Sequence, residues 1–274
     1  VALGRLAMVA NTTASNNTAV GKSAMAANTT GGDNSAFGGN ALTANTTGAY
    51  NTAVGYEALY AHTTGNSNVA IGVNSMKATT TATDNTAVGK DAMAANTTGG
   101  ANVAVGRTAL DANTTGASNV AVGRNALGAN TTADDNVAVG LDSLKANTTG
   151  AENTAIARNA LYSNTTGNSN VAVGRSALYA NTTASNNIAI GLDSLKANTT
   201  GYSNTAVGRS ALGLNTEGFN NTAVGNYAFY DHTTGDNCMA MGYDAGRTGS
   251  PGGQISTQNN TLSFGDENIS EANI

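Results

Sequence analysis

One short motif recurs along the chain at a constant interval, and this interval constrains the fold more than any other feature. The motif Asn-(Thr/Val/Ile/Ser)-Ala-(Val/Ile/Phe)-Gly begins at an asparagine that returns every 17 residues. Val1–Gly4 continues the series upstream and Cys238–Gly242 continues it downstream, so that fifteen units follow one another without insertion or deletion. The asparagines are Asn17, Asn34, Asn51, Asn68, Asn85, Asn102, Asn119, Asn136, Asn153, Asn170, Asn187, Asn204 and Asn221.

The length of the repeat favours a β-solenoid over a helical array. The consensus is N-[TV]-A-V-G-[RK]-x-A-L-x-A-N-T-T-G-x-x, whose residues we number as positions 1 to 17. A straight helix advances about 100° per residue, so this period does not bring one helix face back into register. We therefore expect an all-β parallel β-roll or β-solenoid with one repeat per coil and about fifteen coils. Positions 1–5 predict one strand and positions 8–12 a second, with a single helical turn at positions 6–11 as the alternative.

Constant spacing predicts columns of like side chains along the solenoid. We expect Val or Ile at positions 2 and 4, together with Leu or Met at position 9, to fill the interior. Asparagines at positions 1 and 12 can form amide ladders. Alanines at positions 3, 8 and 11 cannot all face inward if the strands alternate. Some of them are therefore expected to face outward and to let a second chain approach closely.

Composition argues against several classes of function. The chain has 1 Cys and 2 His, which leaves little for a multi-cysteine metal site or for histidine-based catalysis. Lys and Arg number 12 against 17 Asp and Glu, which argues against a nucleic-acid partner. No apolar run is long enough for a transmembrane helix, and the calcium β-roll pattern is absent. We therefore expect no catalytic residue, cofactor or metal ligand, and we do not expect an enzyme.

The repeat motif resembles two families of fibrous proteins. Asn-Thr-Ala-Val-Gly, as at residues 51–55 and 204–208, resembles the repeat in the head domains of trimeric autotransporter adhesins. The longer unit, through Asn-Thr-Thr-Gly, is similar to repeats in tail fibres of tailed bacteriophages. The resemblance covers about residues 1–248. It implies a left-handed parallel β-roll assembled as a homotrimer, with an extracellular place in a virion tail fibre.

The end of the sequence departs from the period. Residues 249–274 break it at Gly249-Ser250-Pro251, and the stretch from Asn259 to Ile269 is similar to the segment before an endosialidase-type chaperone in phage fibres. We expect residues 1–248 to form a repetitive shaft and residues 249–274 a non-repetitive tail that leads to a removed chaperone domain.

The resemblance implies a structural and adhesive fibre protein whose shaft presents a host-receptor-binding tip. A bacterial autotransporter-type adhesin head at the cell surface is the main alternative. An ice-binding β-solenoid is a third hypothesis, because threonines at positions 13 and 14 form ranks. Adjacent threonines point apart, which weighs against it.

Candidate receptor contacts gather near the end of the repeats. Aromatic side chains can stack on sugars, and the densest group lies in the last coils. The expected partner is a host cell-surface glycan or protein, besides further copies of this chain. The candidates are Tyr227, Tyr230, His232, Tyr243 and Arg247.

The basic residues are confined to positions 6 and 10 of the repeat. They form either an anionic-glycan stripe or a solvated edge with ion pairs to acids at position 7, such as Asp91. Where position 6 is Leu141 or Leu192, the positive charge moves to position 10, which favours ion pairs. Cys238 replaces an asparagine of position 1 and is expected to be a buried structural thiol.

Overall fold

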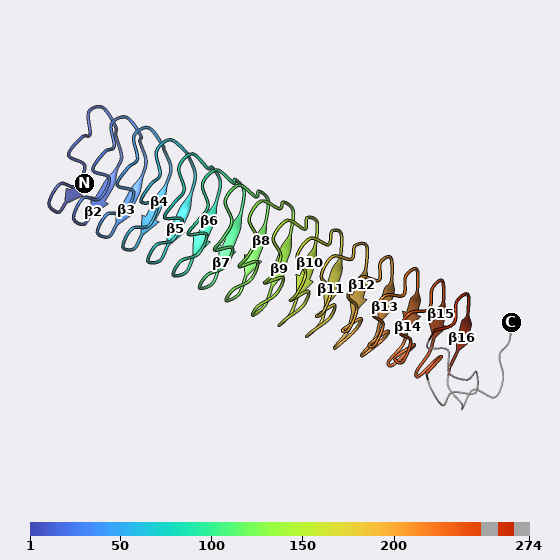
Figure 1. Ribbon diagram of the computed structural model, residues 1–274. Helices are drawn as coiled ribbons and strands as arrows, with labels where there is room; N and C mark the ends of the chain where they lie inside the picture. The colour runs from blue at the N-terminus through green and yellow to red at the C-terminus, as the bar shows by residue number, and fades with distance from the viewer. Residues whose placement is uncertain (248–256, 266–274) are drawn as a thin grey trace. The chain divides into compact units, whose positions relative to one another are not determined.

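The chain folds into stacked coils that each contribute one short strand (Figure 1). The computed structural model describes residues 1–247 and 257–265, and these residues form strands and turns without a helix. The chain divides into two compact units, Val1–Asn136 and Val137–Ile274. In each unit the strands pair in parallel at the 17-residue spacing, so the predicted all-β solenoid is confirmed.

The first unit contains strands β1 to β8, which pair in chain order (Figure 1). Ala87 of one strand lies opposite Ala104 of the next, so each residue faces its own equivalent in the following repeat. The strands are β1 (Ala2–Leu3), β2 (Thr18–Val20), β3 (Ser35–Phe37), β4 (Thr52–Val54), β5 (Val69–Ile71), β6 (Thr86–Val88), β7 (Val103–Val105) and β8 (Val120–Val122).

The second unit contains strands β9 to β16 in the same arrangement. Ala155 lies opposite Ala172, which repeats the register of the first unit. The strands are β9 (Val137–Val139), β10 (Thr154–Ile156), β11 (Val171–Val173), β12 (Ile188–Ile190), β13 (Thr205–Val207), β14 (Thr222–Val224), β15 (Met239–Met241) and β16 (Leu262–Phe264).

The last strand, β16, lies within the segment that the sequence assigned to the tail. Leu262 pairs with Met239 at a separation of 23 residues, six more than one repeat. The backbone N–H of Asp236 donates to Oδ1 of Asn259 at 2.8 Å, the same bond that an ordinary coil makes at this corner. Part of the expected tail therefore continues the strand column. Its residues 249–256 and 266–274 lie outside the described residues.

The interior is narrower than the sequence suggested. Alanine at position 3 is fully buried in every coil from Ala19 to Ala240. The side chains at positions 2 and 4 are half-buried or exposed, so the prediction that they fill the interior is wrong. Because successive side chains on a strand point to opposite faces, burying position 3 turns positions 2 and 4 outward. Leu or Met at position 9 is buried as predicted, from Met25 to Leu212.

Of the three alanine positions, only position 11 reaches the surface. Alanines at positions 3 and 8 both face inward, because position 8 lies in a turn and does not continue the alternation of the strand. Position 11 is half-buried, so the expected outward-facing alanines are limited to it. Any close approach of a second chain to the strands would therefore meet Val, Ile and Thr side chains.

Positions 6–11 form a turn in place of the predicted second strand. The residues at positions 7 and 9 have left-handed backbone conformations, such as Asn125 at φ 57° and Leu127 at φ 51°. Such residues continue neither a strand nor a right-handed helix, so the helical alternative is wrong as well. The turn still bonds one coil to the next, because Leu110 N–H donates to the carbonyl oxygen of Ala126 at 2.9 Å.

Glycine at position 5 ends every regular strand except β10, which Ala157 follows at φ 102°. Gly106 has φ +137°, and a Cβ on it would lie 2.6 Å from the carbonyl oxygen of Gly123 in the next coil. Both the conformation and the close approach of backbone favour glycine here. The sharp turn that follows places positions 6 and 7 on the outer edge of the coil.

Candidate functional site

Two columns of buried asparagine side chains, at positions 1 and 12 of the repeat, bond each coil to the next. At position 12, Nδ2 of Asn113 donates to Oδ1 of Asn96 and to the carbonyl oxygen of Gly116, both at 2.9 Å. At position 1, the backbone N–H of Asn102 donates to Oδ1 of Asn85 at 3.0 Å. These side chains are fully buried. The predicted amide ladders are confirmed, and they hold outer side chains at one constant interval along each unit.

Histidine takes the place of asparagine twice at position 12. His62 is fully buried, and its Nε2 donates to the carbonyl oxygen of Gly65 at 2.8 Å. Burial lowers the pKa of His62 because the charged imidazolium is desolvated. His232 is buried in the same way beside Gly235, and its ring stacks on Phe229 with centroids 4.8 Å apart. The candidate receptor contact His232 is thus an interior residue.

The first surface of interest is the strand face, defined as the outward side chains at positions 2 and 4 of β1 to β8 and of β9 to β15. Val105 is 37% exposed and Ile71 39% exposed in the first unit, and Ile190 is 40% exposed in the second. Position by position, the strand face holds Val, Ile, Thr, Ser, Leu, Phe and Met, and no charged residue. In each unit it is a continuous uncharged band.

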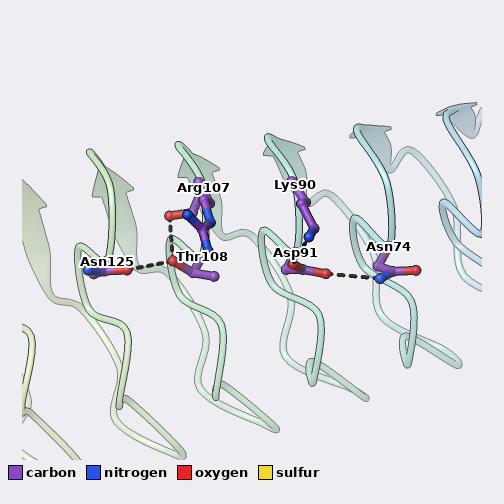
Figure 2. A network of polar contacts seen from close by, with 6 residues as sticks. All are labelled: Asn74, Lys90, Asp91, Arg107, Thr108 and Asn125. Carbon is purple, nitrogen blue, oxygen red and sulfur yellow. Dashed lines mark hydrogen bonds and ion pairs between the residues drawn. The ribbon is translucent and has the colours of Figure 1, made fainter.

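The second surface is the charged flank, defined as positions 6, 7 and 10. Figure 2 shows four successive coils of it in the first unit. Nδ2 of Asn74 donates to Oδ1 of Asp91 at 3.0 Å, and Lys90 Nζ lies 3.7 Å from Oδ2 of the same carboxylate. The Thr108 hydroxyl lies 2.6 Å from Oδ1 of Asn125 (Figure 2). Polar side chains at position 7 therefore bond from coil to coil on the outside as well.

Ion pairs on the charged flank use acids at position 7, as predicted. Besides Lys90–Asp91, Lys145 Nζ lies 3.2 Å from Oδ1 of Asp142, and Lys196 Nζ lies 3.2 Å from Oδ1 of Asp193. The hydrogen bond to Asp142 raises the pKa of Lys145. The last two pairs occur in the two coils where position 6 is Leu, so the moved lysine keeps an acidic partner.

The structure brings three of the candidate receptor contacts together in the second unit. The guanidinium carbon of Arg247 lies 5.1 Å from the ring centre of Tyr227 and 5.3 Å from that of Tyr230. The two rings meet edge to face with centroids 5.6 Å apart. Arg247 also donates from Nη1 to Oδ1 of Asp244 at 3.1 Å. Tyr243 is 57% exposed at position 6 of the last regular coil.

Sequence reasoning missed a recess on the charged flank of the second unit. It has a volume of about 400 Å³ and lies where position 10 is Gly213. The available signal was the interruption of a column of long side chains by one glycine. The lining residues are Tyr179, Ala180, Asp193, Lys196, Ala197, Ser210, Gly213, Leu214 and Tyr230.

Neither a metal centre nor a membrane span is found in the described part of the chain. Residues 1–247 and 257–265 hold no group of three or more His, Cys, Asp or Glu that could bind a metal ion. No helix among them is long and apolar enough to cross a bilayer. Cys238 is buried as predicted, with its Sγ 3.2 Å from the carbonyl oxygens of Asp236 and Gln258.

Comparison with known proteins found no match to this chain. The chain matches no family model, no curated protein and no solved structure.

Proposed function

We propose that the chain is the shaft of an extracellular adhesive fibre, a homotrimer that belongs to a bacteriophage tail fibre and presents a receptor-binding tip. Its role is mechanical and adhesive, without catalysis or a cofactor. The observation that carries the proposal is the strand face, an uncharged and largely apolar band that recurs in every coil of both units.

The strand face is unlike a surface that is meant to face water. A solvated sheet face normally carries polar and charged side chains, and the charged flank shows that this chain does place charges outside. Extended exposed apolar patches mark interaction sites. The chemistry of the strand face therefore supports a covering partner.

A further copy of the same chain is the partner that fits best. The side chains of the strand face recur at the coil spacing of about 4.8 Å. A partner with the same repeat meets every coil in the same way, whereas a globular partner meets only a few. Closed symmetry around one axis lets three such faces cover one another. Rigid copies held together then present any surface contact three times, which raises avidity for a repetitive receptor.

An autotransporter-type adhesin head on a bacterial surface remains the second candidate, because it would use the same strand face. The ice-binding hypothesis receives less support from the threonines. At position 13 the hydroxyl of Thr114 donates to the carbonyl oxygen of Thr131 at 3.0 Å, and the same bond recurs in other coils. From the second coil onward the described threonines of position 13 are half-buried and those of position 14 are exposed, which leaves one exposed hydroxyl column instead of two.

The test is a native mass measurement on the purified chain, for which we expect about three times the chain mass of 27.1 kDa. A triple variant, Val88→Lys with Val105→Lys and Val122→Lys, should dissociate into folded single chains, because it puts adjacent positive charges on the strand face. The matched control is Ala94→Lys at position 10, where another coil has Lys77. A wild-type chain that stays monomeric at micromolar concentration contradicts the homotrimer. The neighbouring genes separate a phage origin from a bacterial one.

A further inference from the structure

The recess in the second unit exists because one glycine interrupts the column at position 10. In successive coils this position holds Tyr162, Tyr179, Lys196, Gly213 and Tyr230. The rings of Tyr162 and Tyr179 stack with centroids 5.1 Å apart and planes 8° apart. On the other side, Tyr230 leans toward the glycine, since a Cβ on Gly213 would lie 2.9 Å from ring atoms of Tyr230. The gap thus has an aromatic wall at each end.

A second place in the same unit shows what the glycine changes. The segments Leu141–Lys145 and Leu192–Lys196 are identical in sequence, and their ion pairs have the same length of 3.2 Å. One repeat after Lys145 stands Tyr162, whose ring centre lies 5.5 Å from the lysine Nζ. One repeat after Lys196 stands Gly213, and the lysine lines an open recess instead.

The polar groups of the recess suit a neutral ligand that is rich in hydroxyl groups. Asp193 and Lys196 offer an acceptor and a donor side by side, and their charges cancel. Ser210 adds a polar residue that is 7% exposed. The small side chains of Ala180 and Ala197 let a ligand lie close to the coil.

We propose that this recess binds a neutral hexopyranose unit of a glycan. The apolar C–H face of the sugar packs on the Tyr179 ring, whose orientation is fixed by its stacking on Tyr162. Sugar hydroxyls donate to the Asp193 carboxylate and accept from the Lys196 ammonium. An anionic sugar gains no net electrostatic attraction here, because Asp193 neutralises the Lys196 ammonium that its carboxylate would approach. The inference rests on the proposed adhesive role, for which it names the ligand class.

The experiment is saturation-transfer NMR on the full chain with the methyl glycosides of glucose, galactose and mannose as probes. Each is used at about 10 mM, because small ligands with few contacts bind with Kd values of about 1 mM. The methyl glycoside of N-acetylneuraminic acid, which contains no neutral hexose, serves as the anionic probe. We expect saturation transfer to at least one neutral glycoside and none to the anionic one.

Three pairs of variants locate the binding. Gly213→Tyr fills the recess and should abolish binding, while Gly128→Tyr makes the same change at position 10 of another coil. Tyr179→Ala should weaken binding about tenfold through loss of the stacking surface, while Tyr60→Ala removes a tyrosine at the same repeat position elsewhere. Asp193→Asn should weaken binding, and Asp142→Asn should not. A far-UV circular dichroism spectrum of each variant verifies that it is folded.

Several results would overturn the inference. They are the absence of binding by all three neutral glycosides, undiminished binding in folded Gly213→Tyr, and binding of the N-acetylneuraminic acid glycoside alone. The mass of each sample is measured in parallel. A monomeric chain that binds a glycoside removes the proposed assembly and keeps the site, whereas a trimer that binds none removes the site and keeps the assembly.

Discussion

Two stretches of the position 12 column in the first unit differ in how completely their polar groups are paired. From Asn96 to Asn130 the column is an unbroken amide chain, in which Asn113 and Asn130 each donate to the preceding Oδ1 at 2.9 and 3.0 Å. From Asn45 to Thr79 it is interrupted by His62. Within the described residues, Asn45 Oδ1, His62 Nδ1 and Thr79 Oγ1 are buried without a hydrogen-bond partner.

The comparison shows what the asparagine does that a substitute does not. An amide both donates and accepts, so each one satisfies its own turn and its neighbour in the next coil. The imidazole of His62 keeps the bond within its own coil to Gly65 and gives up the bond between coils. A buried polar atom without a partner costs about 1–3 kcal/mol. The stretch from Asn45 to Thr79 is therefore the weaker of the two.

The largest expected effect comes from breaking the intact column with Asn113→Ala. The change removes the donor to Asn96 Oδ1. It also removes one of the two bonds to the Gly116 carbonyl, which keeps Asn102 Nδ2, and one of the two made by Asn130 Nδ2, which keeps the Ala133 carbonyl. We expect a loss of about 2–4 kcal/mol in the free energy of unfolding, measured by urea denaturation. Thr79→Ala is the control, since it removes a hydroxyl that is already unpaired together with one buried methyl group. Relief of the unpaired hydroxyl and loss of the methyl have opposite signs, so stability should change by less than about 0.5 kcal/mol. Equal losses in both variants would contradict the comparison.

Repairing the interrupted column should have the next largest effect. The double variant His62→Asn with Thr79→Asn gives Asn45 Oδ1 a donor and restores amides in successive coils. We expect a gain of about 1–3 kcal/mol in the free energy of unfolding, read as a higher urea midpoint at unchanged slope. An unchanged midpoint would show that water already satisfies these atoms.

The third prediction concerns pH. Burial lowers the pKa of His62 below its usual value of 6.5, so below that pH the unfolded chain takes up a proton that the folded chain resists. Stability should therefore be highest above pH 6.5 and decline as the pH falls, by at most about 1.4 kcal/mol per pH unit from this group. Denaturation at pH 7.5 and pH 5 checks this. His62→Asn should reduce the difference, and a variant with the wild-type dependence would exclude His62 as its source.

The smallest effect is expected on the outer column at position 7. Thr108→Val removes the hydroxyl that lies 2.6 Å from Asn125 Oδ1 and keeps the shape of the side chain. Because these groups reach water, we expect a loss of about 0.5 kcal/mol or less. A loss as large as that of Asn113→Ala would mean that inner and outer columns contribute alike.

The sequence predicted what depends on spacing alone. Asparagines such as Asn85 and Asn102 recur without slippage, and this suffices for parallel register, stacked coils and amide ladders. The same spacing could have predicted the burial of His232, because this residue stands one repeat after Asn215 in the position 12 column.

The repeat pattern did not predict the features that depend on backbone conformation. Leucine rarely adopts a left-handed conformation, yet Leu110 has φ 53° because its turn buries the side chain completely. That turn, together with the buried methyl of Ala104, decides which face of the strand points outward. The glycine among long side chains at position 10 was visible in the sequence, but the recess at Gly213 also depends on where the surrounding side chains lie, which the pattern does not give.

The equivalence of successive registers has a genetic consequence. Because Ala87 lies opposite Ala104, and Ala104 opposite Ala121, removing the residues of one repeat would bring Ala87 opposite Ala121 with every column still aligned. Unequal recombination between near-identical gene segments produces such changes. Gain or loss of one repeat could therefore change the length of this molecule in steps of one coil, about 4.8 Å each, without altering the packing between the coils on either side.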